Sequence, residues 1–227
     1  MYHPEFPRIR FASTVMLVRD TQASAIEVFM VRRSPRSGFA PDAFVFPGGT
    51  VDPRDYTTPA AWSGERIARE FRAFAHDVLP SSEPAVGAFD ASALVHAAVR
   101  ELREEASVEL DPAGMLLYSH WITPPTELRR YNTHFFIARA PHAQPGVADR
   151  IETHDERWIE PAHALSEHAA GRMHLVYPTV KHLERLAAHA SVEDALTFAR
   201  AKPVLTIMPD RAPSEGFVMP AELEDRW

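Results

Sequence analysis

Apolar residues occur along the chain in two kinds of pattern, one typical of strands and one typical of helices. Short runs rich in valine, isoleucine and phenylalanine, bounded by polar or proline-containing turns, predict strands. These runs lie at residues 12–18, 26–31, 44–46, 115–122, 131–140, 152–159 and 204–208, the sixth of them beginning as an acidic stretch. The first two flank a polar turn at 20–22 and are expected to pair like a hairpin.

The longest helical pattern begins near Asp90 or Ser92, either of which could cap it, and ends by Asp111, which precedes a proline. Its apolar residues cover an arc of roughly 140°, so one face should pack on a core. They are Leu94, Val95, Ala98, Val99, Leu102 and Ala106. Shorter helices are expected at 161–171, 177–189 and 191–201. Because strands and helices intermix throughout, the pattern predicts an α/β (α+β) sandwich.

Residues 52–91 differ in composition from the rest of the chain. Four prolines punctuate this segment, and its middle, residues 64–79, has large apolar side chains at helical spacing. We expect those side chains to bury against the parent domain. A helix that binds a partner, or a lid over a substrate, is the alternative interpretation.

Composition and charge exclude several classes of protein. The chain has 227 residues, 45% of them hydrophobic, and a formal net charge of −7. The absence of a long Lys/Arg run argues against general nucleic-acid binding. The absence of cysteine excludes disulfides, thiolate zinc sites and thiol catalysis. No secretory signal pattern and no apolar run of about 20 residues is present, so we expect a cytoplasmic protein that does not span a membrane.

Three carboxylates lie together on the long predicted helix. Glu101, Glu104 and Glu105 stand at positions i, i+3 and i+4, within an arc of roughly 100° beside the apolar face. Like charges at this spacing repel, and a bound cation would relieve the repulsion. A solvated acidic patch on an amphipathic helix is the alternative interpretation of these three residues taken alone.

A proline and two glycines, Pro47, Gly48 and Gly49, follow the short strand at 44–46 and precede this helix. The order of these features resembles the Nudix hydrolase family, whose signature is G-x5-E-x7-R-E-U-x-E-E-x-G-U, with U an aliphatic residue. Gly49 corresponds to its first glycine, residues 100–106 to its central run and Val108 to its last aliphatic residue. The resemblance implies a single Nudix domain over residues 1–227, with a mixed sheet flanked by helices and a helical insertion at about 52–91.

The chain departs from this signature in three ways. From Gly49 to Arg100 there are 51 positions where the signature has 14, an insertion of 37 residues. Counted back from Arg100, the early glutamate falls on Ser92, and the late glycine falls on Ser107. A glycine at the last position would relax the turn after the helix. An interrupted signature of this kind resembles the coenzyme A diphosphatase-like subgroup, as do the segments at 121–124, 129–136, 152–158 and 177–179.

The resemblance implies a site for Mg²⁺ or Mn²⁺. Glu101, Glu104 and Glu105 would be its ligands, with the backbone at Gly49 nearby, and oxygen donors of this kind suit a hard divalent cation. Arg100 is expected to be structural and to pair with Glu104 four residues later.

Gly48 is likewise expected to be structural, because adjacent glycines allow a close approach of backbone to ligand. The general base remains open from the sequence. It is Glu105 or its neighbour Glu104 on the helix, or a glutamate of the later acidic stretch, either Glu152 or Glu156.

Substrate phosphate would be bound by guanidinium groups, which bind phosphate bidentately. The candidates are Arg32, Arg33, Arg129 and Arg130, and the candidates for stacking on a base are Phe39, Trp121 and Tyr131. We expect a metal-dependent hydrolase of a diphosphate linkage in a small nucleoside-diphosphate derivative such as coenzyme A or an acyl-coenzyme A. The alternatives are an ADP-ribose or dinucleotide pyrophosphatase, and a nucleotide-binding or sensor module with the same fold. A homodimer is also left open.

Overall fold

The computed structural model describes residues 9–21, 25–57, 88–142, 144–212 and 216–227. The helix expected at 64–79, and with it most of the 52–91 insertion, lies outside the described residues.

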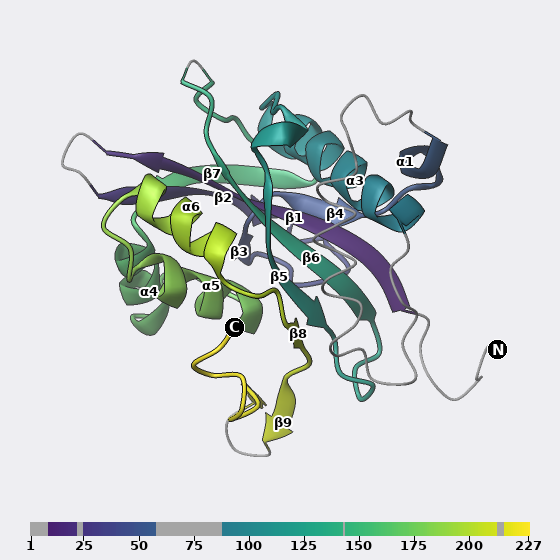
Figure 1. Cartoon of the computed structure of the whole chain (residues 1–227), viewed down its shortest axis with the longest axis vertical. Coiled ribbons are helices and arrows are strands. Elements are labelled where there is room, and N and C mark those ends of the chain that lie inside the picture. The colour runs from purple at the N-terminus through teal and green to yellow at the C-terminus, as the bar shows by residue number, and fades with distance from the viewer. Residues whose placement is uncertain (1–8, 22–24, 58–87, 143, 213–215) are drawn as a thin grey trace.

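The described residues form one large mixed sheet with helices on both faces (Figure 1). Its main path runs β3-β2-β1-β6-β5-β8, with β4 paired to β1 and β7 paired to β2. The strands are β1 (Ile9–Asp20), β2 (Ile26–Arg33), β3 (Phe44–Val45), β4 (Gly48–Thr50), β5 (Leu116–Ile122), β6 (Arg130–Arg139), β7 (Thr153–Ile159) and β8 (Thr206–Ile207). The expected hairpin-like pair of β1 and β2 is present, with Val18 opposite Val28 and Asp20 opposite Ile26.

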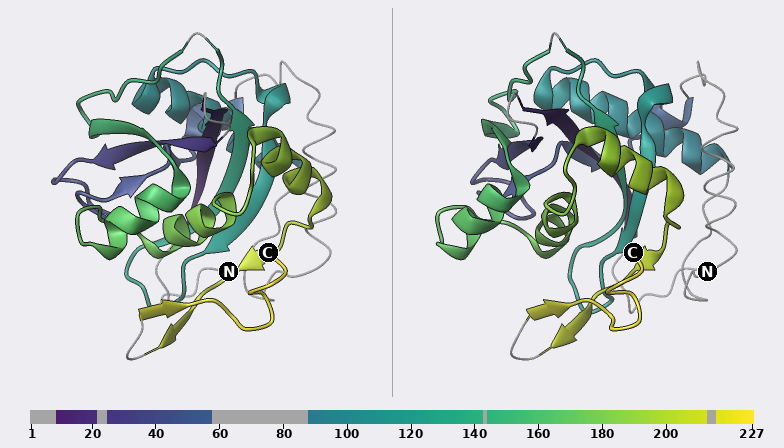
Figure 2. Two further views of the ribbon diagram at one scale, coloured as in Figure 1. Left: turned by 90° about the vertical axis from the view of Figure 1, so that its left-hand side faces the viewer. Right: turned by 60° about the vertical axis from the view of Figure 1, so that its left-hand side comes forward.

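Alternation along β1 supplies both faces of the sheet. Val15 and Leu17 belong to the core beneath α3 (Ala88–Ala106), whereas Met16 and Val18 belong to the core on the opposite face. Successive side chains of a strand point to opposite faces, so one strand supports two separate apolar layers. Helices α4 (Pro161–Ala169), α5 (Tyr177–Leu186) and α6 (Val192–Ala201) cover that second face (Figure 2). The expected sandwich is therefore confirmed.

Helix α3 buries the apolar stripe expected from its sequence, including Leu94 and Leu102, which are 1% and 0% exposed. The prediction that Asp90 or Ser92 caps this helix is wrong, because α3 already includes Ala88 and both residues lie inside it. Ala91 is 1% exposed, so the buried stripe starts before Ser92 and needs helical backbone on its N-terminal side.

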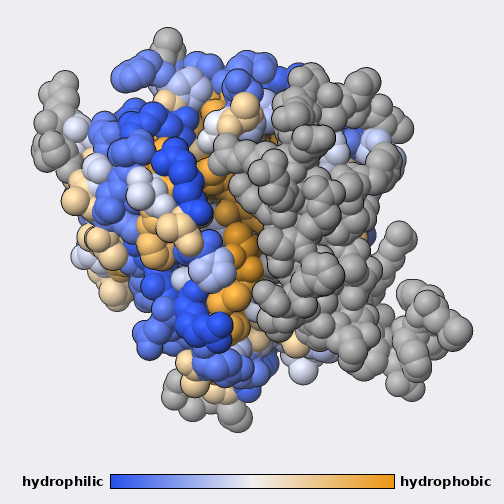
Figure 3. All heavy atoms as spheres, viewed as in Figure 1, coloured by the Kyte–Doolittle hydropathy of each residue, from blue (hydrophilic) through white to orange (hydrophobic). Residues whose placement is uncertain are grey.

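The end of the chain contains structure that the sequence did not indicate. Residues 209–227 lie beyond the last strand expected from the sequence, and β9 (Asp210–Ala212) and β10 (Gly216–Val218) form a short antiparallel pair within them. Two further short elements are α1 (Pro53–Thr57) and the 3₁₀ turn η1 (Pro112–Gly114). Among the described residues, no helix is long and apolar enough to cross a lipid bilayer. Figure 3 shows a band of hydrophobic residues beside a largely hydrophilic region of one face.

Ser107 ends α3 in a left-handed conformation, with a φ of 54°. Its backbone N–H donates to the Arg103 carbonyl at 3.1 Å, which closes the last turn of the helix. Glycine occupies such positions at less cost, because a β-carbon is strained there. This is the position at which the sequence signature has a glycine, so the serine adopts the conformation that the glycine would adopt.

We predict that Ser107→Gly raises the free energy of unfolding by about 0.5–1 kcal/mol, because it removes the strain of the β-carbon. Ser92→Gly is the matched control: it places glycine inside the same helix and should lower the free energy of unfolding by about 0.5–1 kcal/mol. Urea unfolding followed by circular dichroism measures both. Equal and negative changes in the two variants would contradict the assignment of Ser107 as the end of the helix.

Candidate active site

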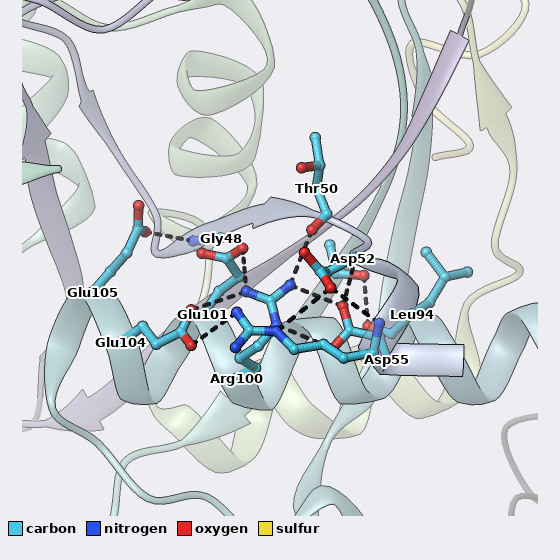
Figure 4. Close-up of polar contacts among 11 residues, drawn as sticks. Gly48, Thr50, Asp52, Asp55, Leu94, Arg100, Glu101, Glu104 and Glu105 are labelled. Carbon is cyan, nitrogen blue, oxygen red and sulfur yellow. Dashed lines mark hydrogen bonds and ion pairs between the residues drawn. The ribbon is translucent and has the colours of Figure 1, made fainter. Parts of the chain in front are cut away.

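The short strand β4 lies between β1 and helix α3. Gly49 pairs with Ser13 in antiparallel register, and the Ser13 hydroxyl donates to the Leu94 carbonyl of α3 at 2.6 Å. The serine hydroxyl thus joins the sheet to the helix directly beneath the two glycines. The carboxylates of α3 are thereby held beside the backbone of Gly48 and Gly49 (Figure 4).

Glu105 is the most deeply buried of these carboxylates, with 3% of its surface exposed. It accepts a hydrogen bond from the Gly48 backbone N–H at 2.9 Å. Burial raises the pKa of Glu105 to about 8, and the nearby charges of Glu101 and Glu152 act in the same direction. The Gly48 N–H and the positive charge of Arg33 act in the opposite direction. At neutral pH this carboxyl group can therefore both hold and release a proton.

Glu101 lies directly against Gly49. A β-carbon at position 49 would overlap the Glu101 carboxylate, so glycine is needed for the close approach. Burial raises the pKa of Glu101, while its ion pair with Arg100, 2.7 Å between Nη1 and Oε1, opposes that shift.

Arg100 is the hub of the surrounding polar contacts. Its guanidinium binds Asp55 with two hydrogen bonds, Nε to Oδ1 at 3.0 Å and Nη2 to Oδ2 at 2.9 Å. It also donates to the Thr50 carbonyl at 3.0 Å, and to Glu101 and Glu104. The expected ion pair with Glu104 is present at 3.0 Å. Arg100 therefore joins β4, α1 and α3.

Asp55 is a site residue that the sequence analysis missed. It is 3% exposed, and its side chain also accepts a hydrogen bond from the Asp52 backbone N–H at 2.8 Å. Counting forward from Gly49 along the signature, rather than back from Arg100, places the early acid at Asp55. Counting back placed the position of this acid at Ser92, whereas the acid that meets Arg100 is Asp55. Its side chain is one methylene shorter than the glutamate of the signature.

The three glutamates share one edge of α3 but face different partners. Glu105 is turned toward Gly48, whereas Glu101 and Glu104 flank the Arg100 guanidinium (Figure 4). Glu104 has 40% of its side chain exposed and also pairs with Arg54 at 3.2 Å. Within the ranges that the structure describes, no three acidic or histidine side chains already converge on one point that could hold a metal ion.

The two candidate bases of the later segment have different surroundings. Glu152 is exposed, and its charge makes a minor contribution to the raised pKa of both Glu101 and Glu105, after burial and nearer groups. Glu156 instead forms an ion pair with Arg150 at 2.8 Å and accepts a hydrogen bond from the Ala148 backbone at 3.4 Å. Of these two glutamates, Glu152 is thus the one whose charge acts on the helix carboxylates.

The four candidate arginines also separate. Arg33 is the one whose charge acts on Glu105. Arg32 pairs with Asp42 at 3.3 Å. Arg130 is 6% exposed and donates to the Thr123 carbonyl at 3.0 Å, so it is held in the interior.

Arg129 is exposed and donates to the Gly38 carbonyl. Among the stacking candidates, Trp121 is 3% exposed and packs in the core, because β5 is buried on both faces. Trp121 is therefore the wrong choice for stacking on a ligand. Phe39 is 42% exposed, with its ring at 5.1 Å from that of Tyr131.

Comparisons with known proteins show similarity to Nudix hydrolases in sequence and in fold. No protein-family model matches the chain. The chain is 26% identical over 184 residues to putative Nudix hydrolase 7 of Caenorhabditis elegans, which covers 78% of this chain and 60% of that protein. It is 36% identical over 52 residues to acyl-coenzyme A diphosphatase NUDT19 of Xenopus laevis, 23% of this chain and 12% of that protein. The chain thus spans less than two thirds of the length of these relatives.

The structure is similar to the crystal structure of a Nudix hydrolase from Alicyclobacillus acidocaldarius. The TM-score is 0.63 at 24% sequence identity, and the match covers 84% of this chain and 96% of that one. The fold is therefore the Nudix fold. The sequence is also similar to Nudix hydrolases, including one acyl-coenzyme A diphosphatase over a short segment, so the resemblance predicted from the sequence is confirmed.

We predict that Asp55→Asn lowers the free energy of unfolding by about 3 kcal/mol, because it leaves a largely buried guanidinium without its main counter-charge. Asp52→Asn is the matched control, since Asp52 lies in the same turn with 48% of its side chain exposed. Its loss should cost less than about 1 kcal/mol. Chemical denaturation of both variants tests this difference, and equal costs would contradict a structural role for the buried pair.

We predict that Glu105→Gln stabilises the metal-free protein at high pH. The folded state raises the pKa of Glu105, so its contribution to stability is fully present below the unfolded value of about 4.5 and is lost as the pH rises through about 8. Glutamine keeps the hydrogen bond from Gly48 but cannot ionise. In the presence of a chelator, we expect the variant to match the wild type at pH 5 and to exceed it by about 2–5 kcal/mol at pH 9.

Denaturant unfolding at the two pH values provides the measurement. Glu109→Gln, which changes an exposed glutamate just beyond α3, should show no such gain. If the free energy of unfolding of Glu105→Gln equals that of the wild type at both pH values, ionisation of Glu105 does not destabilise the folded protein and the prediction is wrong.

Proposed function

We propose that the chain is a hydrolase that cleaves a diphosphate linkage in a nucleoside-diphosphate derivative, with the aid of a divalent cation. The observation that carries this proposal is the placement of Glu101 and Glu105 beside the backbone of Gly49 and Gly48, with Glu104 on the same edge of the helix. Similarity to Nudix hydrolases supports the same chemistry. Enzymes of that kind generally use divalent metal ions.

The donor set fits Mg²⁺ or Mn²⁺. It consists of carboxylate oxygens, which hard cations prefer. Burial is the main cause that raises the pKa of Glu101 and Glu105, and the charges of neighbouring glutamates act in the same direction. A cation at this edge of the helix would relieve the cost of ionising both groups. Glu101, Glu104 and Glu105 would hold the ion, with Gly49 close to it. A bound cation would neutralise charge on the diphosphate as the linkage breaks.

Other residues of the chain would bind the substrate phosphate, position the glutamates and act as the general base. Arg33 stands beside Glu105 and supplies positive charge for a substrate phosphate. Arg100 acts as a positioning residue, since it fixes Glu101 and Glu104 and does not face a substrate itself. Glu152 is the favoured general base, because it is exposed and its charge acts on both Glu101 and Glu105.

Coenzyme A or an acyl-coenzyme A is the favoured substrate. The interrupted signature and the short match to an acyl-coenzyme A diphosphatase support it. ADP-ribose or a dinucleotide is the second candidate, because it carries the same diphosphate linkage. A sensor without catalysis was suggested by Ser92 and Ser107, yet Asp55 supplies the early acid and Ser107 adopts the required left-handed turn. These two observations favour an enzyme over a sensor.

We predict that the protein with Mg²⁺ or Mn²⁺ converts coenzyme A to 4′-phosphopantetheine and adenosine 3′,5′-bisphosphate. Parallel incubations with ADP-ribose, NADH and diadenosine polyphosphates, with products identified by mass spectrometry, rank the candidate substrates. Glu104→Gln and Glu105→Gln should each lower kcat by about 100-fold or more, because each removes a carboxylate from the cation site. Glu109→Gln should retain full activity. Normal rates in both site variants would contradict the site, and tight binding without turnover of any compound would favour the sensor.

A further inference from the structure

A cavity of about 420 Å³ opens at the surface near the turn between β5 and β6. Side chains of three separate segments line it: the loop between β2 and β3, the β5–β6 turn, and β9. The lining residues are Phe39, Thr126, Glu127, Leu128, Arg129 and Arg211. Its volume is in the range of small-molecule sites.

The cavity carries one guanidinium that no carboxylate of the described residues neutralises. Arg211 forms an ion pair with Glu127, so these two charges cancel. Arg129 contacts only the carbonyl oxygen of Gly38 among the polar contacts described, and a carbonyl does not cancel its charge. The described lining therefore has a net positive charge, which favours an anionic ligand.

The backbone near Arg129 is shaped around its side chain. A β-carbon at Gly38 would overlap the Arg129 guanidinium and displace that exposed group from its place against the loop. The carbonyl of Gly38 orients the guanidinium at the rim of the cavity. A guanidinium held in this way has its remaining N–H groups available for bidentate binding of a phosphate.

Phe39 adds an aromatic surface to the same cavity. Its ring is 42% exposed, and the ring of Tyr131 supports it edge-on at 5.1 Å. A rigid and partly exposed aromatic ring beside a cation suits a planar, electron-rich base.

The cavity is connected to the carboxylate cluster. Arg33 donates to the Phe39 carbonyl at 3.1 Å, and its charge also lowers the pKa of Glu105. In the sheet, Tyr131 of β6 pairs with Arg10 of β1, three residues before Ser13, which pairs with Gly49 of β4. Two strand spacings and three residues along a strand place the backbones of Tyr131 and Gly49 roughly 14 Å apart. A nucleotide that extends from the glutamates has to span a distance of this order to reach the cavity.

We propose that this cavity binds the nucleoside end of the substrate and selects nucleosides that carry a phosphate monoester in addition to the diphosphate. Phe39 stacks on the base, and Arg129 binds the phosphate monoester. The proposal rests on the proposed diphosphate hydrolysis and deepens it, since it distinguishes coenzyme A, which has a 3′-phosphate, from 3′-dephospho-coenzyme A, which lacks one. The aromatic side of the cavity thus binds the base of the ligand, and the cationic side binds its phosphate monoester.

The test compares kcat/KM for coenzyme A and for 3′-dephospho-coenzyme A in four proteins. The wild type should prefer coenzyme A by about 10- to 100-fold, the range expected for a charge-assisted contact. Arg129→Gln should abolish this preference and change the rate on 3′-dephospho-coenzyme A by less than about 3-fold. Gly38→Ala should reduce the preference, because it displaces the guanidinium. Arg200→Gln, which removes an exposed arginine paired with Glu193 on α6, should leave the preference unchanged.

A binding measurement separates this proposal from the proposed function. Calorimetric titration with adenosine 3′,5′-bisphosphate and with adenosine 5′-monophosphate needs no turnover. Tighter binding of the bisphosphate to the wild type, lost in Arg129→Gln, would support the cavity even if neither substrate were hydrolysed. Hydrolysis of both substrates at equal efficiency, or equal loss on both in Arg129→Gln, would overturn the cavity assignment and leave the hydrolase intact. Because Arg129 is exposed, its substitution does not touch the core, and circular dichroism verifies the fold.

Discussion

The buried ion pair between Arg100 and Asp55 connects three parts of the chain that are far apart in sequence. One guanidinium reaches the strand β4 through the Thr50 carbonyl, the short helix α1 through Asp55, and the neighbouring glutamates of α3. Removing two charges from water is costly, and the bidentate geometry with further hydrogen bonds offsets that cost. The orientation of Glu101 and Glu104, and with it the chemistry of the site, depends on this contact.

The pair also leaves the site with an excess of negative charge. Arg100 brings one positive charge to Asp55, Glu101 and Glu104, while Glu105 and Glu152 stand close by. Burial and mutual repulsion raise the pKa of Glu101 and Glu105, so these carboxylates are destabilised when no cation is bound. The same strain makes the edge of α3 suitable for a divalent ion. The ionised carboxylates that the proposed function needs thus lower the stability of the folded protein when no cation is bound.

Local patterns were sufficient to predict much of this molecule. The periodicity of α3 predicted its buried stripe and the grouping of its three glutamates, because both depend only on helix geometry. The intermixing of strands and helices along the chain likewise predicted a sandwich. Asp55 was missed because its partner Arg100 lies 45 positions later, so a count made back from Arg100 does not cross the insertion to reach it.

Burial was harder to predict than secondary structure. Trp121 and Arg130 looked like ligand-binding residues, yet both lie in the interior, because neighbouring strands and helices cover both faces of their strands. The β9–β10 pair escaped notice because strands of three residues carry almost no periodic signal. A sequence pattern describes the helix or strand that contains a residue. The exposure of that residue's side chain depends on other helices and strands, distant in sequence, that pack against it.

The ion pair between Asp55 and Arg100 joins two segments that lie 45 positions apart in sequence. The two halves of the site are therefore aligned by a contact between two side chains and not by a fixed spacing along the chain. A chain in which this acid and this arginine face each other can assemble the same edge of α3 beside β4 whatever the number of positions between them. Such a site is found by asking which acid meets the arginine, because a fixed spacing does not identify it.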